Sequence, residues 1–591
     1  MHVNAIIKIK AGFKFLLKSN ERIKDILAIS LLSLLLIIYL IPGLIGLEKL
    51  YFDDVSLTFS RLFGVSRLVQ NGEFPLWDPY SFTGARPYFV MVESPIYNVF
   101  FYPLFLIANI NNINQSFFVL YLIPYSLLVI FAGLGVYFFT RKILQFGITA
   151  SFVSSLLYAT APFMACSIKS IHDTHIYAFI PWVLMFIFLF IRTNRIRWWL
   201  ASILFMVFLS VSVTLNTLVR AYFIIVLIVF FSTLLLFIRK KIKFSVLVNA
   251  VLAFAVSSGI LAFIWFGMIE GIRWVETGQS LKYSELVADP HYSMFPGYLM
   301  NLFMQDFHGL VSCSHTWGNA LRYDNNILLS GGFVPSLLVV LSVFLFIRKF
   351  RTLPYRKKVF FFIFLSIFIL TIIVMLGKFT PVYWFFCMTI PWVFKIPYVF
   401  YFLFYQGFTY SILVGYGLDF LSDPAVREEL GKSRLVYVYS AAVVLLLAAA
   451  FFEPVYTSKN FMFSIQSLLS LKELNWFLVN KVSFLALCIA VSIASFANMK
   501  KSFFFAAVLA ALVAGESLFF GYISLYRNTV SPRLTEQNNI YKIIFRTHYG
   551  RPTDYPMTKD VEEFRKFYAD KDVRFIGAIS SIDNISWLIG K

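Results

Sequence analysis

Long apolar runs, separated by short charged clusters, dominate this chain from end to end. A bilayer is crossed by about 20 mainly apolar residues in a helix, so each run of that length predicts one transmembrane helix. The pattern therefore predicts an all-α polytopic membrane protein with about thirteen transmembrane helices. The runs lie near residues 25–47, 116–140, 148–166, 175–191, 198–216, 221–238, 244–268, 331–347, 359–377, 397–418, 435–452, 481–498 and 503–525.

Every second connection between these runs is basic, which predicts the orientation of the chain. Short cytoplasmic loops carry the Lys and Arg excess of membrane proteins, so the N-terminus is expected in the cytoplasm. An odd number of spans then places the segment 526–591 outside, as a small α+β tail, together with loops at 48–115, 270–330 and 453–480. The basic groups are residues 8–24, 141–142, 192–197, 239–243, 348–358, 427–434 and 500–501.

Two further apolar stretches, near 96–110 and 380–394, fall in predicted outer segments and would break this alternation if they crossed the membrane. Both contain Pro and aromatic residues, which suit a membrane interface. We expect juxtamembrane helices there. The chain is thus predicted to form one membrane domain, residues 1–525, followed by the tail.

Composition supports the membrane prediction and narrows the chemistry. Hydrophobic residues make up 59% of the chain and charged residues only 14%, against about 25% charged in soluble proteins. The net charge of +21 is therefore interpreted as a signal of orientation, and no nucleic acid is expected as a partner. The cysteines have no metal-binding spacing, and no phosphate-binding or dinucleotide-binding glycine motif is present. Energy must come from an ion gradient or from an activated substrate.

Adjacent carboxylates, Asp53 and Asp54, follow the first predicted span. Their mutual repulsion would raise the pKa of one of them, which is a way to obtain a general base or a metal ligand. The alternative interpretation is that both acids stabilise the start of the following helix and face water.

Two groups of motifs resemble one bacterial family. The run Gly72-Glu73-Phe74-Pro75-Leu76-Trp77-Asp78-Pro79-Tyr80-Ser81-Phe82-Thr83-Gly84 is similar to a signature of YfhO-type membrane proteins, members of the GT-C glycosyltransferase superfamily. Downstream, Gly377-Lys378-Phe379-Thr380-Pro381-Val382-Tyr383, then Phe394-Lys395-Ile396-Pro397, and Gly415-Tyr416-Gly417-Leu418-Asp419 resemble a second conserved set of that family. This chain departs from the family at Asp78, where Asn is common, and at Lys395, where Arg is common.

The resemblance implies a polyprenyl-phosphate-linked sugar as donor, with inverting transfer on the outer face and an acid of the first outer loop as base. Asp53 and Asp54 match that position. The departing lipid phosphate needs a cation, and Lys395, Arg273, Arg220 and Arg86 are the candidates at the outer edge. For Lys395 and Arg273 the alternative is a role as interfacial anchors.

Further polar and aromatic residues of the predicted outer face are candidates for substrate binding: Glu93, Trp77, Tyr80, His172, Asp173 and His175. A divalent metal ion held by Asp53, Asp54 and His175 is a further possibility. The alternative for residues 169–175 is a short solvated turn capped by Asp173.

These observations lead to one main hypothesis. The chain is expected to be a glycosyltransferase of the bacterial inner membrane that transfers a sugar to an envelope glycan, lipid or protein. A transporter or flippase of lipid-linked glycans is the main alternative, although a translocation path should place ionisable residues deep in the membrane. A structural partner of envelope machinery is a third class, and it would not require paired acids.

Overall fold

A computed structural model describes residues 21–45, 53–72, 98, 100–109, 112–169, 171–211, 215–239, 244–260, 262, 294, 296–303, 331–383, 385, 400–423 and 509–518. Within these ranges all regular secondary structure is helical. The main helices are α2 (Glu21–Leu44), α7 (Ile123–Phe139), α8 (Ile148–Ala159), α10 (Ile171–Thr193), α11 (Ile196–Ser210), α12 (Leu215–Ile238), α13 (Phe244–Ile260), α16 (Phe333–Lys349), α17 (Tyr355–Met375) and α19 (Phe400–Leu421).

Each of these helices falls on one of the predicted apolar runs. Among the described residues, five helical segments are long and apolar enough to cross a membrane: Glu21–Leu44, Gln115–Leu144, Ile171–Thr193, Ala221–Ile238 and Tyr355–Met375. Over the described residues, the prediction of an α-helical membrane protein is therefore confirmed, and the number of thirteen spans stays a prediction. The runs at 435–452 and 481–498 lie outside the described residues, and only Leu509–Leu518 of the last run is described.

The second span is a composite helix. Helix α6 (Ile113–Phe117), the π-helical turn η1 (Phe118–Leu122), α7 and a second π-helical turn, η2 (Thr140–Leu144), follow one another without a break. Beyond α8, a short helix α9 (Pro162–Cys166) and a 3₁₀ turn η3 (Ser167–Lys169) lead into α10. The whole of this region packs around α7.

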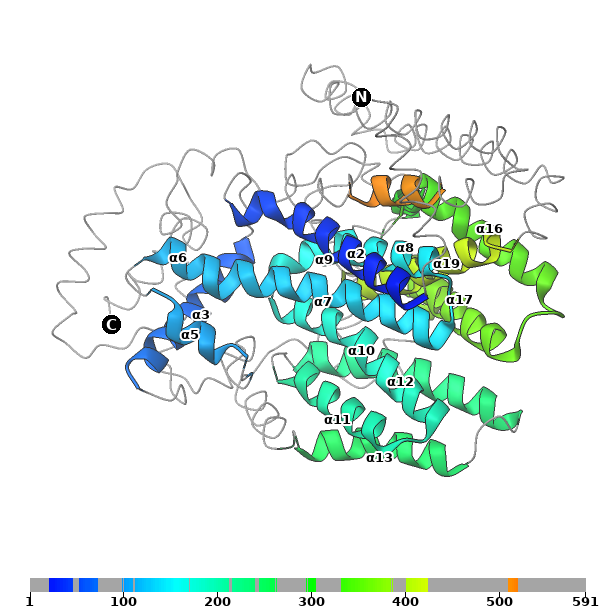
Figure 1. Ribbon diagram of the computed structural model, residues 1–591, viewed down its shortest axis with the longest axis horizontal. Coiled ribbons are helices and arrows are strands. Elements are labelled where there is room, and N and C mark those ends of the chain that lie inside the picture. Colours follow the sequence, from blue (N-terminus) through cyan, green and yellow to red (C-terminus); the bar gives the residue numbers. More distant parts are fainter. Residues whose placement is uncertain are drawn as a thin grey trace, which may run out of the picture.

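Helices α7, α8, α10 and α19 contact one another in the centre of the bundle, and the remaining helices surround them (Figure 1). Helix α2 lies on α7 and α8. Helices α11 and α13 cover α10 on the other side, while α16 and α17 flank α19. Close approach depends on small residues, as is usual between membrane helices. A Cβ atom at Gly415 would lie 2.1 Å from Ser154 Oγ, and one at Gly417 would lie 2.4 Å from the Leu338 carbonyl oxygen.

One end of the bundle gathers the basic connections, and we call it the basic end. Arg192 Nη1 donates a hydrogen bond to the Lys142 carbonyl oxygen at 3.2 Å, which joins the ends of α10 and η2. The Tyr355 hydroxyl, at the start of α17, donates to the Leu235 carbonyl oxygen near the end of α12 at 3.2 Å. Lys349 pairs with Asp423, which joins the ends of α16 and α19. The basic connections that the structure describes, at 141–142, 192–197 and 348–358, therefore lie at one end, as the alternation predicts.

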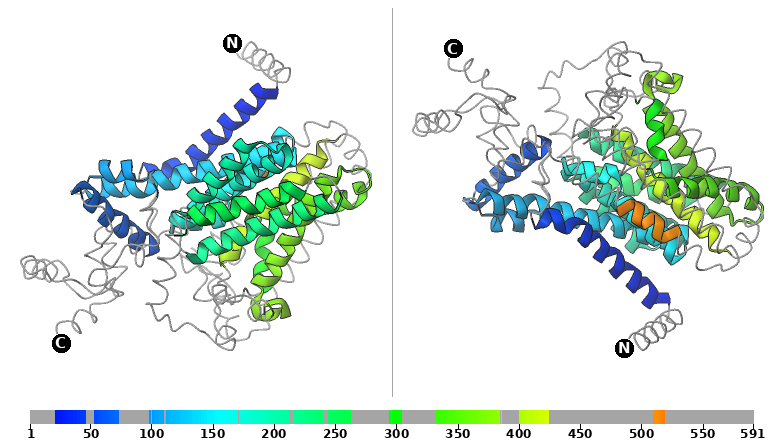
Figure 2. Two further views of the ribbon diagram at one scale, coloured as in Figure 1. Left: turned by 90° about the horizontal axis from the view of Figure 1, so that it is seen from below. Right: turned by 90° about the horizontal axis from the view of Figure 1, so that it is seen from above.

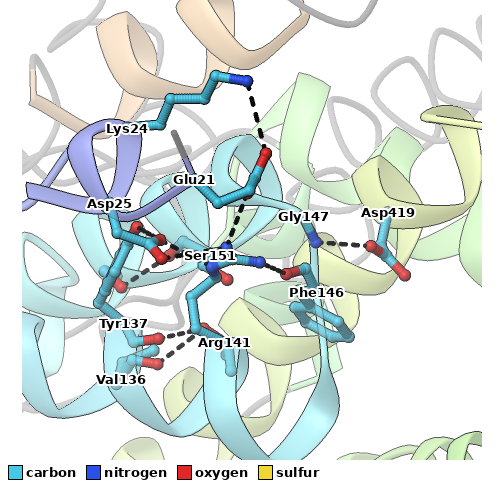
Figure 3. A network of polar contacts seen from close by, with 12 residues as sticks. Glu21, Lys24, Asp25, Val136, Tyr137, Arg141, Phe146, Gly147, Ser151 and Asp419 are labelled. Carbon is cyan, nitrogen blue, oxygen red and sulfur yellow. Dashed lines mark hydrogen bonds and ion pairs between the residues drawn. The ribbon is translucent and has the colours of Figure 1, made fainter. Parts of the chain in front are cut away.

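A polar network fastens α2, α7, α8 and α19 at the basic end (Figure 3). Arg141 Nε lies 2.8 Å from Asp25 Oδ1, and the Tyr137 hydroxyl donates to the same oxygen at 2.7 Å. Asp419 accepts from the Gly147 backbone N–H at 2.9 Å and pairs with Lys357 at 2.7 Å. Gly147 is the N-cap residue of α8, and the Asp419 carboxylate binds its backbone N–H, as the N3 side chain does in a capping box.

The predicted first outer loop contains two helices, α3 (Asp53–Gln70) and α5 (Tyr102–Ile107). Both lie at the end of the bundle away from the α16–α17 turn (Figures 1 and 2). The short helix α5 falls within the stretch 96–110, where a helix was expected. The tail 526–591, the loop 453–480 and most of the loop 270–330 lie outside the described residues.

Candidate functional site

Helix α3 is fastened to α5 by side-chain hydrogen bonds from its C-terminal half. Gln70 Nε2 donates to the carbonyl oxygens of Phe105 and Ala108 at 2.7 and 2.6 Å, and Ser66 Oγ donates to Phe105 at 2.7 Å. The last carbonyl groups of a helix have no partner within it. Two side chains of α3 thus provide hydrogen-bond donors for carbonyl groups at the C-terminal end of α5, and these bonds fix the two helices relative to each other.

The N-terminal half of α3 is held by an aromatic column. The ring of Phe59 meets Phe117 edge-on at 5.2 Å, and Phe117 stacks on Tyr121 at 5.5 Å. The Tyr121 hydroxyl in turn donates to the Ile168 carbonyl oxygen in η3. Helix α3 also contacts η3, so it lies against the turn that precedes α10. Asp53 lies six residues before Phe59, about 9 Å along the helix from that ring contact.

This turn is itself held firmly. The Tyr125 hydroxyl donates to the Met164 carbonyl oxygen at 3.1 Å, and Thr174 Oγ1 donates back to the Ser167 carbonyl oxygen at 2.9 Å. Ser167 Oγ donates to Met164 at 2.7 Å. These bonds fold the chain back so that α10 begins immediately after η3.

As a result His172, Asp173 and His175 lie inside the first turns of α10, with exposed fractions of 8%, 8% and 2%. The alternative prediction of a solvated turn is wrong, because α9 and η3 keep the segment packed against α7. His172 Nε2 lies 3.6 Å from Asp173 Oδ1, within ion-pair distance when the imidazole is protonated. The cluster is a buried, ionisable group that directly follows η3, the turn that contacts α3.

His175 has a defined structural partner. Its Nε2–H donates to the Phe208 carbonyl oxygen at 2.6 Å, which assigns the proton to that nitrogen because a carbonyl can only accept. The ring also stacks on Phe179 at 4.4 Å. His175 therefore joins α10 to the end of α11, and only Nδ1 is left for a substrate or a metal ion. Across the described ranges, no three ligating side chains converge on one point.

The other predicted site residues divide into two groups. Asp53 and Asp54 are the first two residues of α3, and Arg220 lies in the second turn of α12. The structure describes the helices of these three residues but not their side chains. A position in the first turn also suits the alternative interpretation, in which Asp53 and Asp54 stabilise the start of the helix. Trp77, Tyr80, Arg86, Glu93, Arg273 and Lys395 lie outside the described residues.

Glu516 is a buried carboxylate whose structural role the sequence did not indicate. Its two carboxylate oxygens accept hydrogen bonds from the backbone N–H groups of Phe333 and Val334, at 2.7 and 3.2 Å. These are the first residues of α16, and they follow Gly331 and Gly332, which offer no capping side chain. A Cβ atom at Gly332 would lie 2.6 Å from Glu516 Oε1, so glycine is needed there for space as well as for its φ of +142°.

Two motifs of the family resemblance have structural roles. Gly377, with a φ of +56°, ends α17 in the left-handed conformation typical of a helix C-terminus. Thr380 Oγ1 donates to the Ile373 carbonyl oxygen at 2.9 Å and reinforces this end. The second motif supplies Gly415 and Gly417, which allow close helix packing, and Asp419, which binds the Gly147 N–H at the basic end.

No protein-family model matches the chain, and no curated protein matches it either.

Proposed function

We propose that this protein is an inverting membrane glycosyltransferase of the GT-C type. It takes the sugar from a polyprenyl-phosphate-linked donor and transfers it to an envelope glycan, lipid or protein. The observation that carries the proposal is the juxtaposition described above. The Phe59–Phe117–Tyr121 column holds the helix that begins with Asp53 and Asp54 against the turn before His172 and Asp173.

In the proposed reaction Asp53 accepts the proton of an acceptor hydroxyl while that oxygen attacks the anomeric carbon. The bond from this carbon to the lipid phosphate breaks at the same time, and the phosphate leaves with the electron pair. Asp54 orients Asp53 or shares a metal ion with it. His172 and Asp173 bind sugar hydroxyls, together with Glu93, Trp77 and Tyr80.

Cations stabilise the departing phosphate in this proposal. Lys395 is the principal candidate, because it occupies the cationic position of the resembled family, and Arg86, Arg220 and Arg273 are the others. A lipid-linked donor already carries its own activation. The lack of a nucleotide-binding motif in the sequence is consistent with such a donor.

The proposal includes the membrane arrangement predicted from the sequence. The chain has about thirteen spans in the bacterial inner membrane, with outer juxtamembrane helices and a small α+β tail on the outer side. The basic end faces the cytoplasm, which places α3 and the start of α10 on the outer side, where lipid-linked sugars of the envelope are used.

The distribution of charge supports an enzyme over a transporter. In the described helices of the bundle (α2, α7, α8, α10–α13, α16, α17 and α19), Asp, Lys and Arg lie near the ends and not in the central turns. Glu516, which is near mid-span by sequence, binds the first turn of α16 and so has a structural partner. A path for a polar glycan would need ionisable groups at depth.

The test uses the purified full-length protein in lipid vesicles with a panel of radiolabelled polyprenyl-phosphate hexoses and an extract of envelope glycans. We expect radiolabel to be transferred to the glycan extract, and we expect no transfer after the protein has been heat-denatured. Movement of a fluorescent lipid-linked glycan between leaflets without any transfer would establish transport instead. If neither transfer nor transport is observed with any donor, both hypotheses are wrong and a structural role is favoured.

A further inference from the structure

The turn between α10 and α11 presents a concentration of exposed positive charge at the basic end. Residues 192–197 are all exposed, and three of the six are arginines: Arg192, Arg195 and Arg197. Lys142 is also exposed, and its backbone carbonyl accepts a hydrogen bond from Arg192. Four cationic side chains thus lie on two neighbouring turns.

The backbone of this turn is fixed by hydrogen bonds. Asn194 adopts a φ of +51°, a left-handed conformation that Asn tolerates better than most residues. Its N–H donates to the Phe190 carbonyl oxygen at 2.7 Å, and the Trp198 N–H donates to Arg195 at 3.0 Å. The arginines therefore start from a rigid frame, which reduces the entropy lost when they bind a ligand.

Two tryptophans flank the arginines at the start of α11. The Trp199 indole N–H donates to the Asn249 carbonyl oxygen of α13 at 2.9 Å, and Trp198 stacks on Phe186 of α10 at 5.8 Å. The Arg197 guanidinium lies 4.7 Å from the centre of the Trp198 ring. Tryptophan at the end of a membrane helix typically lies at the level of the lipid headgroups, so the arginines are placed at the same depth.

The charge of this turn is not neutralised within the described part of the chain. The carboxylates described at the basic end are already engaged: Glu21 and Asp25 with Arg141, Asp419 with Lys357, and Asp423 with Lys349. None of them pairs with Arg192, Arg195 or Arg197. An external anion at headgroup depth is the natural complement.

We propose that the 192–197 turn, with Lys142 and Trp198, is a binding site for the phosphate of an anionic phospholipid headgroup. A guanidinium can bind two phosphate oxygens at once, and three of them on a fixed turn favour a headgroup with a net negative charge over a zwitterionic one. The acyl chains lie along the exposed apolar side chains of Ile196, Leu200 and Leu204 on α11. The site is distinct from the proposed catalytic region, which is at the other end of α10.

The test measures lipid retention by native mass spectrometry of the purified protein, titrated with phosphatidylglycerol or phosphatidylcholine in a neutral detergent. The test variant carries Arg192→Gln, Arg195→Gln and Arg197→Gln. The matched control carries Arg348→Gln, Arg351→Gln and Arg356→Gln, which remove the same number of arginines from the exposed α16–α17 turn at the same end.

A basic residue near a membrane surface contributes about 1 kcal/mol to binding an anionic lipid, so three should change the dissociation constant by about a hundredfold. We expect the test variant to lose phosphatidylglycerol to that extent while the control keeps it. Phosphatidylcholine binding should change little in either protein. Added salt should weaken the parent's phosphatidylglycerol binding.

Equal loss in both variants would overturn the proposal, because it would show a general effect of net charge, and so would unchanged binding in the test variant. Glycerol 3-phosphate that displaced the lipid at comparable concentration would mean a free-anion site instead. Arg195→Gln alone, at an exposed position, replaces the triple variant if that protein does not fold, and it should weaken binding about fivefold.

Discussion

At the residue scale, buried polar side chains of this protein mainly complete the backbone of other helices. Asp419 binds the N–H before α8, Glu516 binds the first turn of α16, and His175 binds the last turn of α11. A backbone group left unpaired in a membrane costs several kcal/mol, so these contacts are strongly constrained. Burial alone therefore does not mark a catalytic residue here, and the candidate acids must be tested by substitution.

The first residue to test is Asp53. General-base catalysis is typically worth about 10²- to 10⁴-fold, so we expect Asp53→Asn to lower the transfer rate by that factor and to leave donor binding intact. Asp54→Asn should cost less unless a metal ion is shared. The measurement is turnover and binding of a radiolabelled donor in vesicles. Full activity of both variants would exclude the proposed mechanism, and loss with Asp54→Asn alone would reverse the two roles.

Glu516 offers a test of the capping role without any assay of activity. Glu516→Gln keeps one carbonyl oxygen for Phe333 or Val334, whereas Glu516→Leu leaves both buried N–H groups unpaired, at about 1–3 kcal/mol each. The thermal unfolding temperature in detergent should fall in the order parent, Gln, Leu. Ser517→Ala on the same helix is the control, since the Ser517 hydroxyl has no partner among the described residues. An equal loss in all three variants would contradict the cap.

At the element scale, the long apolar runs predicted the helices well. A 20-residue run buried in lipid must pair its own backbone groups, and a helix is one of the few structures that does so. The boundaries near 166–175 were misplaced, since the break is a short helix and a 3₁₀ turn held by Tyr121 and Tyr125 and not a loop. Helix α3 was anticipated only through the alternative role of Asp53 and Asp54. Contacts such as Asp25 with Arg141, 116 positions apart, could not be predicted, because a single sequence contains no information on which helices become neighbours.

The Asp25–Arg141 contact is the clearest link between two elements. Both side chains are about four-fifths buried, with exposed fractions of 22% and 19%, and Tyr137 adds a bond to the same carboxylate. A double-mutant cycle of Asp25→Asn and Arg141→Gln should therefore give a coupling of about 1–2 kcal/mol in unfolding free energy.

The exposed Glu21–Lys24 pair on the same helix is the matched control for this cycle. The side chain of Glu21 is 67% exposed, and such pairs typically contribute about 0.3–0.5 kcal/mol. A coupling between Asp25 and Arg141 no larger than that of the control pair would show that this ion pair does not hold α2 in place.

At the scale of the whole molecule, the two ends differ in chemistry. The basic end joins its helices through ion pairs and exposes the arginines of the 192–197 turn. The opposite end joins α3, α5, η3 and α10 through tyrosine and serine hydroxyls and aromatic rings, and it holds the buried cluster of His172, Asp173 and His175. This difference between the two ends is consistent with the proposed orientation and with the proposed site at the end opposite the basic one.

Orientation in the membrane is the prediction on which the proposed site depends. With Cys166, Cys313, Cys387 and Cys488 replaced by serine, single cysteines are introduced at the exposed positions Asn71, after α3, and Arg195, in the basic turn. The basic end should face the cytoplasm because Lys and Arg are retained there.

An impermeant maleimide added to intact cells should therefore label Asn71→Cys and spare Arg195→Cys until the membrane is permeabilised. Thr535→Cys, in the predicted outer tail, should behave like Asn71→Cys. The opposite result at Asn71 and Arg195 would place α3 and His172 on the cytoplasmic side, and the proposed use of an outward-facing lipid-linked donor would then be wrong. Equal labelling of the two positions in intact cells would contradict the separation of the two ends by a bilayer.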